Sequence, residues 1–141
     1  MLRSITSVLV GVVLGAMMVF VVQLFAHQLF PAPDGFDATN PEAIKALPFA
    51  TKFSVLVSWS AGAFTGGVAA ALISKRWAPA AWVVAGTILL FAATNFSAFP
   101  HPLWMMIGSI PATALGGYLA IIVTGARYGR PPQGPKSGLF G

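Results

Sequence analysis

The sequence predicts an all-α integral membrane protein with four transmembrane helices, and two observations support this class. Of its 141 residues, 57% are apolar and only 8% are charged, against roughly 25% charged residues in soluble domains. The charges also leave three uncharged runs, at 4–33, 53–74 and 77–126, each longer than the ~20 residues that cross a bilayer. A soluble helical bundle is excluded because stretches such as SVLVGVVLGAMMVFVVQLF lack the polar face that water requires.

The longest uncharged run holds two helices rather than one. As a single helix, 77–126 would be ~75 Å long at ~1.5 Å per residue, far more than the ~30 Å of hydrocarbon. The motif FPHP at 99–102 divides it, because proline lacks an amide donor and disfavours helix in the preceding residue. The related FPAP at 30–33 ends the first helix in the same way. We therefore expect one domain, 1–126, with helices at 4–29, 50–74, 78–98 and 103–126.

The basic residues predict which helix ends face the cytoplasm. They precede the first predicted helix, separate the second from the third and follow the fourth: Arg3, Lys75, Arg76, Arg127, Arg130 and Lys136. All three acidic residues instead fall in the segment 31–52. Because basic residues favour the cytoplasmic side of a membrane, both termini are expected in the cytoplasm. The localisation that follows is a multi-pass protein of a bacterial inner (cytoplasmic) membrane.

The outer loop, 30–49, is expected to hold a short interfacial helix at 41–47. Thr39 or Asn40 offers a side-chain cap, and Pro41 suits the first turn of a helix. This helix would lie on the membrane surface rather than cross it.

The C-terminal segment, 127–141, reads RYGRPPQGPKSGLFG and forms a basic tail rich in proline and glycine. Such a tail is attracted to anionic lipid by about 1 kcal/mol for each basic residue. A docking peptide is the alternative, since Pro132 and Pro135 make a PxxP motif.

Small residues recur at every fourth position in two of the predicted helices. The second helix carries Ser58, Gly62, Gly66 and Ala70, and the fourth carries Gly108, Ala112, Gly116 and Ala120, with an offset of 50 at each position. The first helix adds Gly11 and Gly15. Such stripes let helix backbones approach closely in lipid, so these residues are predicted to form helix-packing interfaces. The matching offset also indicates two helical hairpins in parallel repeat.

The composition argues against several classes of function. The chain has no cysteine, which excludes disulfides, thiolate catalysis and cysteine-ligated metals. Apart from Lys52 near a helix start, the predicted spans contain no Asp, Glu, Lys or Arg. This argues against proton-coupled transport and against acid–base catalysis inside the bilayer. The basic residues are scattered over helix ends, so nucleic acid is not an expected partner, and we expect a protein that is not an enzyme.

A polar cluster toward the outer helix ends contains the candidate ligand-binding residues: Gln23, His27, Lys52, Asn95 and His101. Together with Asp34 and Asp37 it could in principle bind a metal, but no ligand spacing supports one. A haem between the two histidines is disfavoured because prolines flank His101. The remaining interpretations are a small neutral or amphiphilic ligand, such as a quinone or lipid headgroup, and a ligand-free layer of interhelical hydrogen bonds. The ligand-free layer is favoured, and we expect neither a metal nor a cofactor.

Three stretches, HQLFPAPDGFD, SWSAGAFTGGVAAALI and FPHPLW, resemble a set of small, uncharacterised bacterial four-helix membrane proteins. The likeness spans most of residues 24–122. It implies the same four-helix topology and attaches no activity, cofactor or catalytic residue to the chain.

Two functions are compatible with these observations. The favoured one is an accessory or assembly subunit in the lipid bilayer, offering its glycine faces to a membrane-protein partner or to copies of itself. The alternative is a channel or permease for a small neutral or amphiphilic solute, or a lipid or quinone binder, which acts through the polar cluster.

Overall fold

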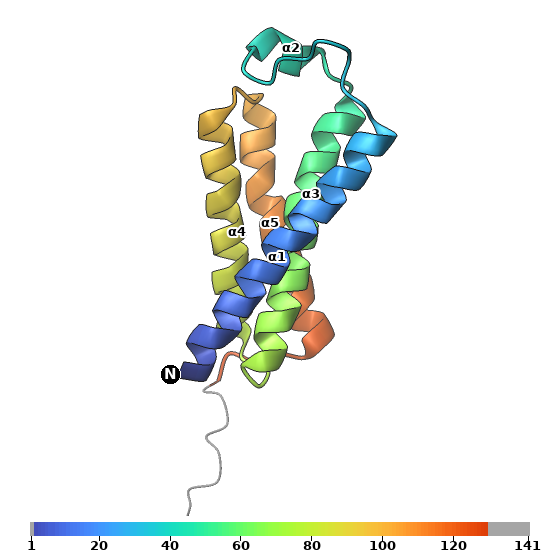
Figure 1. Cartoon of the computed structure of the whole chain (residues 1–141). Helices are drawn as coiled ribbons and strands as arrows, with labels where there is room; N and C mark the ends of the chain where they lie inside the picture. The colour runs from blue at the N-terminus through green and yellow to red at the C-terminus, as the bar shows by residue number, and fades with distance from the viewer. Residues whose placement is uncertain (1, 130–141) are drawn as a thin grey trace, which may run out of the picture.

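The computed structural model describes residues 2–129, and the regular elements within that range are all helices. Their bounds are α1 Leu2–Leu29, α2 Pro41–Ala46, α3 Phe49–Ile73, α4 Ala78–Ala98 and α5 Leu103–Thr124 (Figure 1). The four long helices are each long and apolar enough to cross a membrane. They lie where the sequence predicted them, with ends that differ by at most two residues, and α2 is the short helix expected between the first two spans.

Proline positions and a side-chain cap set the helix ends. α1 ends at Leu29 and α4 ends at Ala98, each immediately before an FPxP motif, as expected from the missing amide donor of proline. Pro102 directly precedes the first residue of α5. α2 begins after Asn40, whose side-chain oxygen accepts a 3.0 Å hydrogen bond from the amide of Glu42. Both FPxP motifs therefore terminate helices, as predicted.

The four long helices form a bundle in which α3 and α4 separate α1 from α5. α3 contacts α1, α4 and α5, and α4 contacts α1 and α5, whereas within the described residues α1 and α5 are not neighbours. The start of α1 and the end of α5 lie at one end of the bundle, here called the terminal end (Figure 1). α2 lies at the opposite end, here called the loop end (Figure 1). α1 lies obliquely across α3 and also contacts α4 in its terminal half, and it leaves α4 toward the loop end (Figure 1).

Glycines let α1 and α3 touch backbone to backbone. A Cβ placed on Gly11 would come within 2.6 Å of the Gly66 carbonyl oxygen, and one on Gly15 within 2.8 Å of the Gly62 carbonyl oxygen. These separations are too short for any real side chain, so only glycine permits this approach. The small-residue stripe predicted on α3 is buried along its whole length.

The stripe on α5 contacts α3, and the adjacent Gly117 contacts α4. A Cβ on Gly116 would lie 2.9 Å from the Cβ of Ala63 on α3, and one on Gly117 would lie 2.8 Å from the Cβ of Ala85 on α4. Ala120 is fully buried beside them. The two remaining predicted members are half-buried: Gly108 and Ala112. The small-residue faces that we expected to bind a membrane-protein partner thus pack largely against helices of the same chain.

The segment after α5 is hydrogen-bonded to the turn between α3 and α4. The Arg127 amide donates to the Arg76 carbonyl at 2.8 Å, and the Ala78 amide donates to the Arg127 carbonyl at 2.9 Å. The indole of Trp82 donates to the Tyr128 hydroxyl at 3.0 Å. Two residues that the sequence assigned to the tail therefore fold with the bundle, and most of the predicted tail lies outside the described residues.

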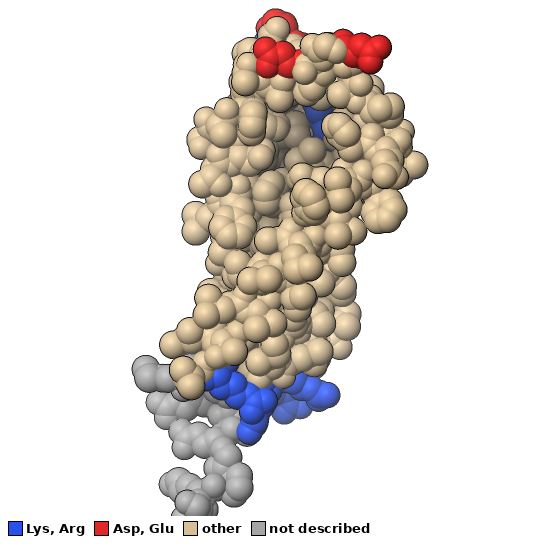
Figure 2. Space-filling model, viewed as in Figure 1, with Lys and Arg blue, Asp and Glu red and all other residues tan. Residues whose placement is uncertain are grey.

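Charge is separated along the bundle axis. Acidic side chains gather at the loop end and most of the basic ones at the terminal end (Figure 2). The basic residues of the terminal end are Arg3, Lys75, Arg76 and Arg127, and those of the loop end are Lys45 and Lys52. The distribution along the helices matches the one from which the orientation was predicted.

Candidate functional site

A pocket of about 240 Å³ lies at the loop end of the bundle. A cavity that holds one water molecule needs only ~10–15 Å³ by the same measure, so this pocket has room for a larger ligand. All five helices contribute to it, as does the segment between α1 and α2. We name it the loop-end pocket, and its lining consists of Gln23, Ala26, His27, Phe30, Ala32, Phe36, Ala38, Ile44, Leu47, Thr51, Lys52, Ser54, Val55, Asn95, Phe99, His101 and Met105.

The five candidate ligand-binding residues all line this pocket. Gln23 and His27 come from α1, Lys52 from α3, Asn95 from α4, and His101 from the turn before α5. His27 is exposed and the other four are half-buried. The structure therefore brings together residues that are up to 78 positions apart in the sequence, from Gln23 to His101.

The two FPxP motifs do more than end helices. Phe30 and Phe99, the first residues of the two motifs, both line the pocket, and so do Ala32 and His101, the third residues. Sequence reasoning found His101 but assigned the phenylalanines to helix termination alone. The repeat of the motif could have identified the phenylalanines. It follows both α1 and α4, so its first and third residues lie at the loop end in both places.

The pocket opens on the side of the bundle, between the loop-end halves of α1 and α4. In the terminal half these helices are packed closely, since a Cβ on Gly11 would lie 2.9 Å from Val84 and one on Gly15 would lie 3.1 Å from Ile88. Toward the loop end α1 leaves α4 (Figure 1), and the surface is hollowed there, with a basic side chain visible inside (Figure 2). A ligand can therefore reach the pocket sideways, from the direction that lipid would occupy.

The segment between α1 and α3 covers the pocket at the loop end. Phe36 and Ile44 line it from this segment, and Ile44 is only 4% exposed. The Nζ of Lys52 donates a 3.0 Å hydrogen bond to the carbonyl of Lys45, which ties α2 to the start of α3. Because this segment covers the loop end, the opening on the side of the bundle is the more direct route into the pocket for an apolar chain.

Lys52 gives the pocket its charge. It is the only Lys, Arg, Asp or Glu among the lining residues. Among the described residues the salt bridge is between Lys45 and Glu42, at 3.0 Å, so no described carboxylate neutralises Lys52. An ammonium group at the edge of an apolar pocket favours an oxyanion, because charge-assisted hydrogen bonds are the strongest of the common ones.

Two other polar side chains of the pocket, Gln23 and His101, make hydrogen bonds within the protein. The side-chain amide of Gln23 donates to the Ser58 hydroxyl at 3.2 Å, and that hydroxyl donates to the Val55 carbonyl at 2.6 Å. The Nδ1 of His101 lies 2.8 Å from the Phe99 carbonyl oxygen. The first of these contacts joins α1 to α3, and it is a hydrogen bond of the kind expected in a polar layer.

The arrangement does not fit a metal centre. The described part of the chain contains no group of three or more His, Cys, Asp or Glu side chains that could hold a metal ion. Asp34 and Asp37 are exposed on the loop and do not line the pocket. His27 is exposed, and one ring nitrogen of His101 is already engaged by the backbone.

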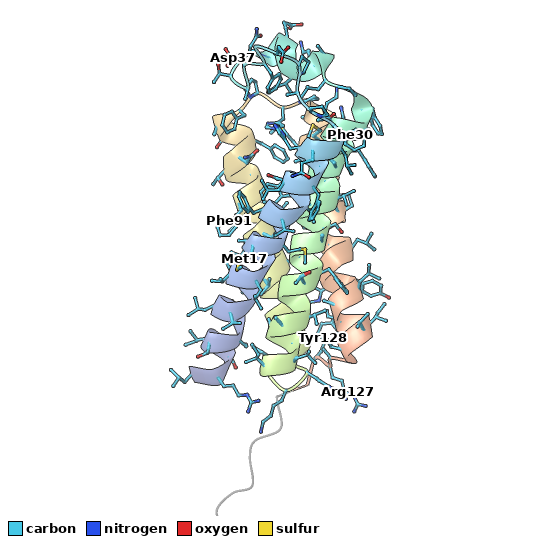
Figure 3. All side chains as sticks on the ribbon, turned by 45° about the vertical axis from the view of Figure 1, so that its right-hand side comes forward. Met17, Phe30, Asp37, Phe91, Arg127 and Tyr128 are labelled. Atoms are coloured by element: carbon cyan, nitrogen blue, oxygen red, sulfur yellow. The ribbon has the colours of Figure 1, made fainter. Side chains whose placement is uncertain are left out.

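Asp37 lies at the outer surface of the loop end (Figure 3), and two hydrogen bonds lower its pKa. The Thr39 hydroxyl donates to its carboxylate at 2.6 Å, and the Thr39 amide donates at 2.9 Å. Because both favour the charged form, they stabilise the turn above the ordinary pKa of aspartate. That contribution is lost as the pH falls through the lowered pKa.

Replacing Thr39 with valine is therefore expected to raise the pKa of Asp37 toward its ordinary value, because the stronger of the two donors is removed. Titration of the carboxyl carbon by NMR measures this directly. An unchanged midpoint in Thr39→Val would show that the hydroxyl does not bind the carboxylate.

Comparison of the chain with family models, with curated proteins and with solved structures finds no match.

Proposed function

We propose that this chain is a non-enzymatic membrane protein that binds an anionic single-chain amphiphile in the loop-end pocket. Lys52 carries the proposal, since it is the one charged group in a pocket whose walls are otherwise apolar or uncharged. A molecule with an oxyanion at one end and an apolar chain satisfies both features. The proposal is a form of the second function that the sequence allowed, a binder of amphiphiles.

The direction of the opening supports a ligand that arrives from the bilayer. The pocket opens between α1 and α4 on the side of the bundle (Figure 2), where lipid tails would surround four membrane-spanning helices. Phe30, which directly follows α1, adds an aromatic ring to the lining. A water-soluble solute would instead need a route through the covering segment, so an amphiphile is the better match.

We further propose that the loop end faces the outside of an inner membrane and that both termini are cytoplasmic. The basic terminal end supports this orientation through the preference of Lys and Arg for the cytoplasmic side. Aromatic rings are present near both ends: Trp104 stacks on Phe49 with centroids 5.4 Å apart near the loop end, and Trp82 pairs with Tyr128 near the terminal end. Such rings favour the two membrane interfaces.

The orientation predicts a pattern of chemical labelling. Because the chain has no cysteine, single cysteines report without background. In intact cells, Asp34→Cys is expected to react with a membrane-impermeant maleimide, whereas Lys75→Cys is expected to react only after the membrane is opened. The reverse pattern would place the loop end in the cytoplasm and contradict the proposed orientation.

The accessory-subunit hypothesis has less support. It depended on glycine faces that remain free for a partner, but Gly62 and Gly66 contact α1, and Gly116 contacts α3. The repeat has sequence support only, since Gly66 and Gly116 occupy matching positions and contact different neighbours. The parallel repeat of two hairpins therefore remains a proposal about the origin of the sequence rather than about its packing.

Photolabelling tests the proposed function. The protein is placed in nanodiscs with a straight-chain carboxylic acid that carries a photoactivatable group on its chain. Labelling is then competed with the unlabelled acid and, as the matched neutral control, with its methyl ester. If Lys52 selects the oxyanion, the acid should compete at a concentration about tenfold lower than the ester or better, from the size of charged hydrogen bonds.

Equal competition by the acid and its ester would contradict an anionic ligand. Labelling that neither compound reduces would contradict a specific binding site of any kind.

A further inference from the structure

Two side-chain amides flank the opening of the loop-end pocket at the same level of the bundle. Gln23 on α1 and Asn95 on α4 both line the pocket, and both are half-buried. On α1, Gly11 approaches Val84 of α4, which lies 73 positions later in the chain, and Gly15 approaches α4 at the same offset. Continued toward the loop end, this offset places Asn95 level with the residue next to Gln23.

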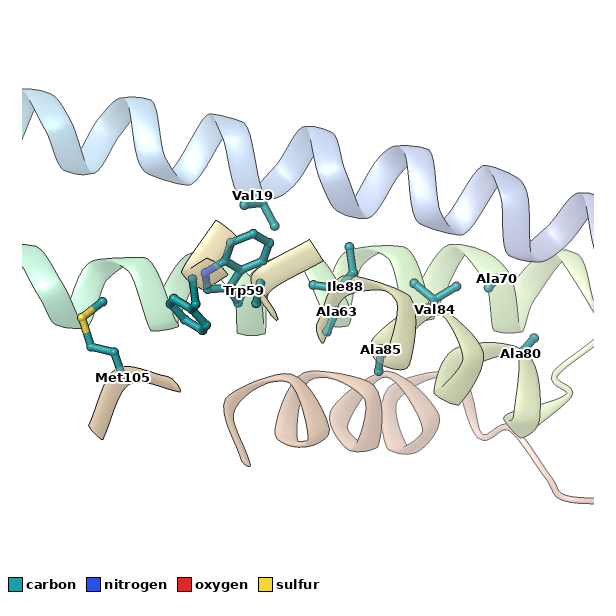
Figure 4. Close-up of a cluster of buried hydrophobic side chains, with 11 residues drawn as sticks. Val19, Trp59, Ala63, Ala70, Ala80, Val84, Ala85, Ile88 and Met105 are labelled. Carbon is teal, nitrogen blue, oxygen red and sulfur yellow. The ribbon is translucent and has the colours of Figure 1, made fainter. Parts of the chain in front are cut away.

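The two amides lie at the inner end of the pocket. Below them, Val19, Trp59 and Ile88 belong to one buried cluster contributed by α1, α3 and α4 (Figure 4). Gln23 follows Val19 by one helical turn, on the loop-end side of this cluster. The chain of a bound amphiphile therefore cannot pass deeper into the bundle, and it leaves through the side opening between the two amides.

Hydrogen bonds determine which end of the Gln23 amide meets a ligand. The Val55 carbonyl can only accept, so the Ser58 hydroxyl donates its single hydrogen to that carbonyl, at 2.6 Å. Toward Gln23 the hydroxyl can then only accept, and it lies 3.2 Å from the donor Nε2. The amide is thereby held in one orientation, with its oxygen Oε1 as the end that Ser58 does not engage.

The Oε1 atom of Gln23 is open to a ligand. It accepts no hydrogen bond within residues 2–129, and the Trp59 indole nitrogen is the one buried side-chain N or O atom in that range without a partner. Packing therefore does not close off Oε1. The Asn95 amide is unpaired and accessible on the same grounds. The pocket thus offers a fixed acceptor at Gln23 and a free amide at Asn95.

From this pairing we infer that the ligand carries a hydroxyl group on its chain, which donates to Gln23 and accepts from Asn95 while Lys52 binds the anionic head. The inference rests on the proposed function and names its ligand more closely, as a single-chain hydroxy acid. Ser58, which holds Gln23, lies six residues after Lys52, or ~9 Å along α3 at ~1.5 Å per residue. The hydroxyl is therefore expected partway along the chain rather than beside the head.

The test compares a straight-chain acid that carries a mid-chain hydroxyl with its methyl ether, each as a competitor in the nanodisc photolabelling assay. A hydroxyl both donates and accepts, whereas an ether oxygen only accepts. The full chain is expected to bind the hydroxy acid about fivefold more tightly, which is the size of one neutral hydrogen bond. Gln23→Met keeps the length of the side chain but lacks the acceptor, and it is expected to bind the two compounds equally.

Ser58→Ala tests the orientation of the amide separately. Ser58 is fully buried, and alanine removes only its hydroxyl, but the Gln23 amide can then present either end to the ligand. The affinity for the ether should rise to that for the hydroxy acid, whereas a merely structural role would weaken both compounds together. An unchanged preference for the hydroxy acid, or an equal weakening of both, would overturn the fixed orientation.

A matched control removes a polar group beside the site. Thr94 precedes Asn95 on α4, but it is exposed, does not line the pocket and donates to the Phe91 carbonyl at 2.8 Å. Thr94→Val should keep the full preference for the hydroxy acid. A preference that persists in Gln23→Met, or its loss in Thr94→Val as well, would overturn the assignment of the acceptor.

The unsubstituted acid of the same length separates this inference from the proposed function. If it competes on the unaltered chain while the hydroxy acid and the ether compete equally, the binding site stands and the second anchor is refuted. If none of the three compounds competes, both the site and the anchor are refuted.

Discussion

Replacing Gly66 with alanine is expected to lower the free energy of unfolding by about 1–3 kcal/mol, the usual range for an overpacked core. The added Cβ would overlap the Gly11 carbonyl oxygen and lie 2.8 Å from Cγ1 of Val84 and 3.1 Å from Cα of Gly15. Two of these neighbours are backbone atoms of α1. They can move only if the whole helix moves, so a rotamer change cannot relieve the clash.

Gly86→Ala provides the matched control. Gly86 lies inside α4, as Gly66 lies inside α3, but a Cβ there would meet nothing within 4 Å. Alanine favours helix over glycine by about 1 kcal/mol, so this variant should be as stable as the parent or more so. Unfolding in mixed micelles, followed by circular dichroism, measures both variants. Equal stability of Gly66→Ala and Gly86→Ala would contradict the α1–α3 packing.

Replacing Lys52 with methionine is expected to weaken binding of a straight-chain acid by about tenfold or more, since a charged hydrogen bond contributes roughly 1.5–3 kcal/mol. Methionine keeps much of the apolar stem and removes the ammonium group. Lys52→Arg retains a positive charge at the same place and should retain most of the affinity. Competition of the photolabelled acid in nanodiscs measures all three proteins.

Lys45→Met controls for a general loss of positive charge at the loop end. Lys45 pairs with Glu42 on the surface of α2, its side chain is 64% exposed, and it does not line the pocket. Its removal should leave the affinity for the acid unchanged. If Lys45→Met weakens binding as much as Lys52→Met, the acid responds to the charge of the whole surface and the pocket assignment fails.

The helix positions could be predicted from the sequence because the features that set them are local. Uncharged runs of sufficient length specify the spans, and the FPxP motifs specify where two of them end. Neither feature depends on how the helices pack. The small deviations occur at helix ends: α5 ends at Thr124, two residues earlier than predicted, because Gly125 adopts a left-handed conformation and caps the helix.

Several residues of the candidate site could also be predicted from the sequence. Polar residues near the same end of neighbouring helices lie at a similar depth, so Gln23, Asn95 and His101 could be grouped without a structure. The opening of the pocket could not be predicted, because it depends on where α1 meets α4. Gly11 and Gly15 of α1 are the positions of close contact with α4, and both lie in the terminal half. The two helices diverge beyond it.

The sequence could not predict which helices the small-residue stripes pack against, for a different reason. A small residue at every fourth position permits close approach of any helix, whether it belongs to the same chain or to another. Only the three-dimensional arrangement shows that Gly62 and Gly66 contact α1. The burial of the Trp59 indole without a hydrogen-bond partner among the described residues likewise depends on which side chains surround it.

The central claim, that an amphiphile binds between the loop-end halves of α1 and α4, is tested most directly by mapping the photolabelled residues. Peptide mass spectrometry of the labelled chain should find the label on residues that line the pocket, such as Val55, Asn95 and Met105, and the unlabelled acid should abolish it. Label spread over outward-facing residues such as Leu90 and Ile122, which are 65% and 55% exposed, and unaffected by competitor, would contradict the account.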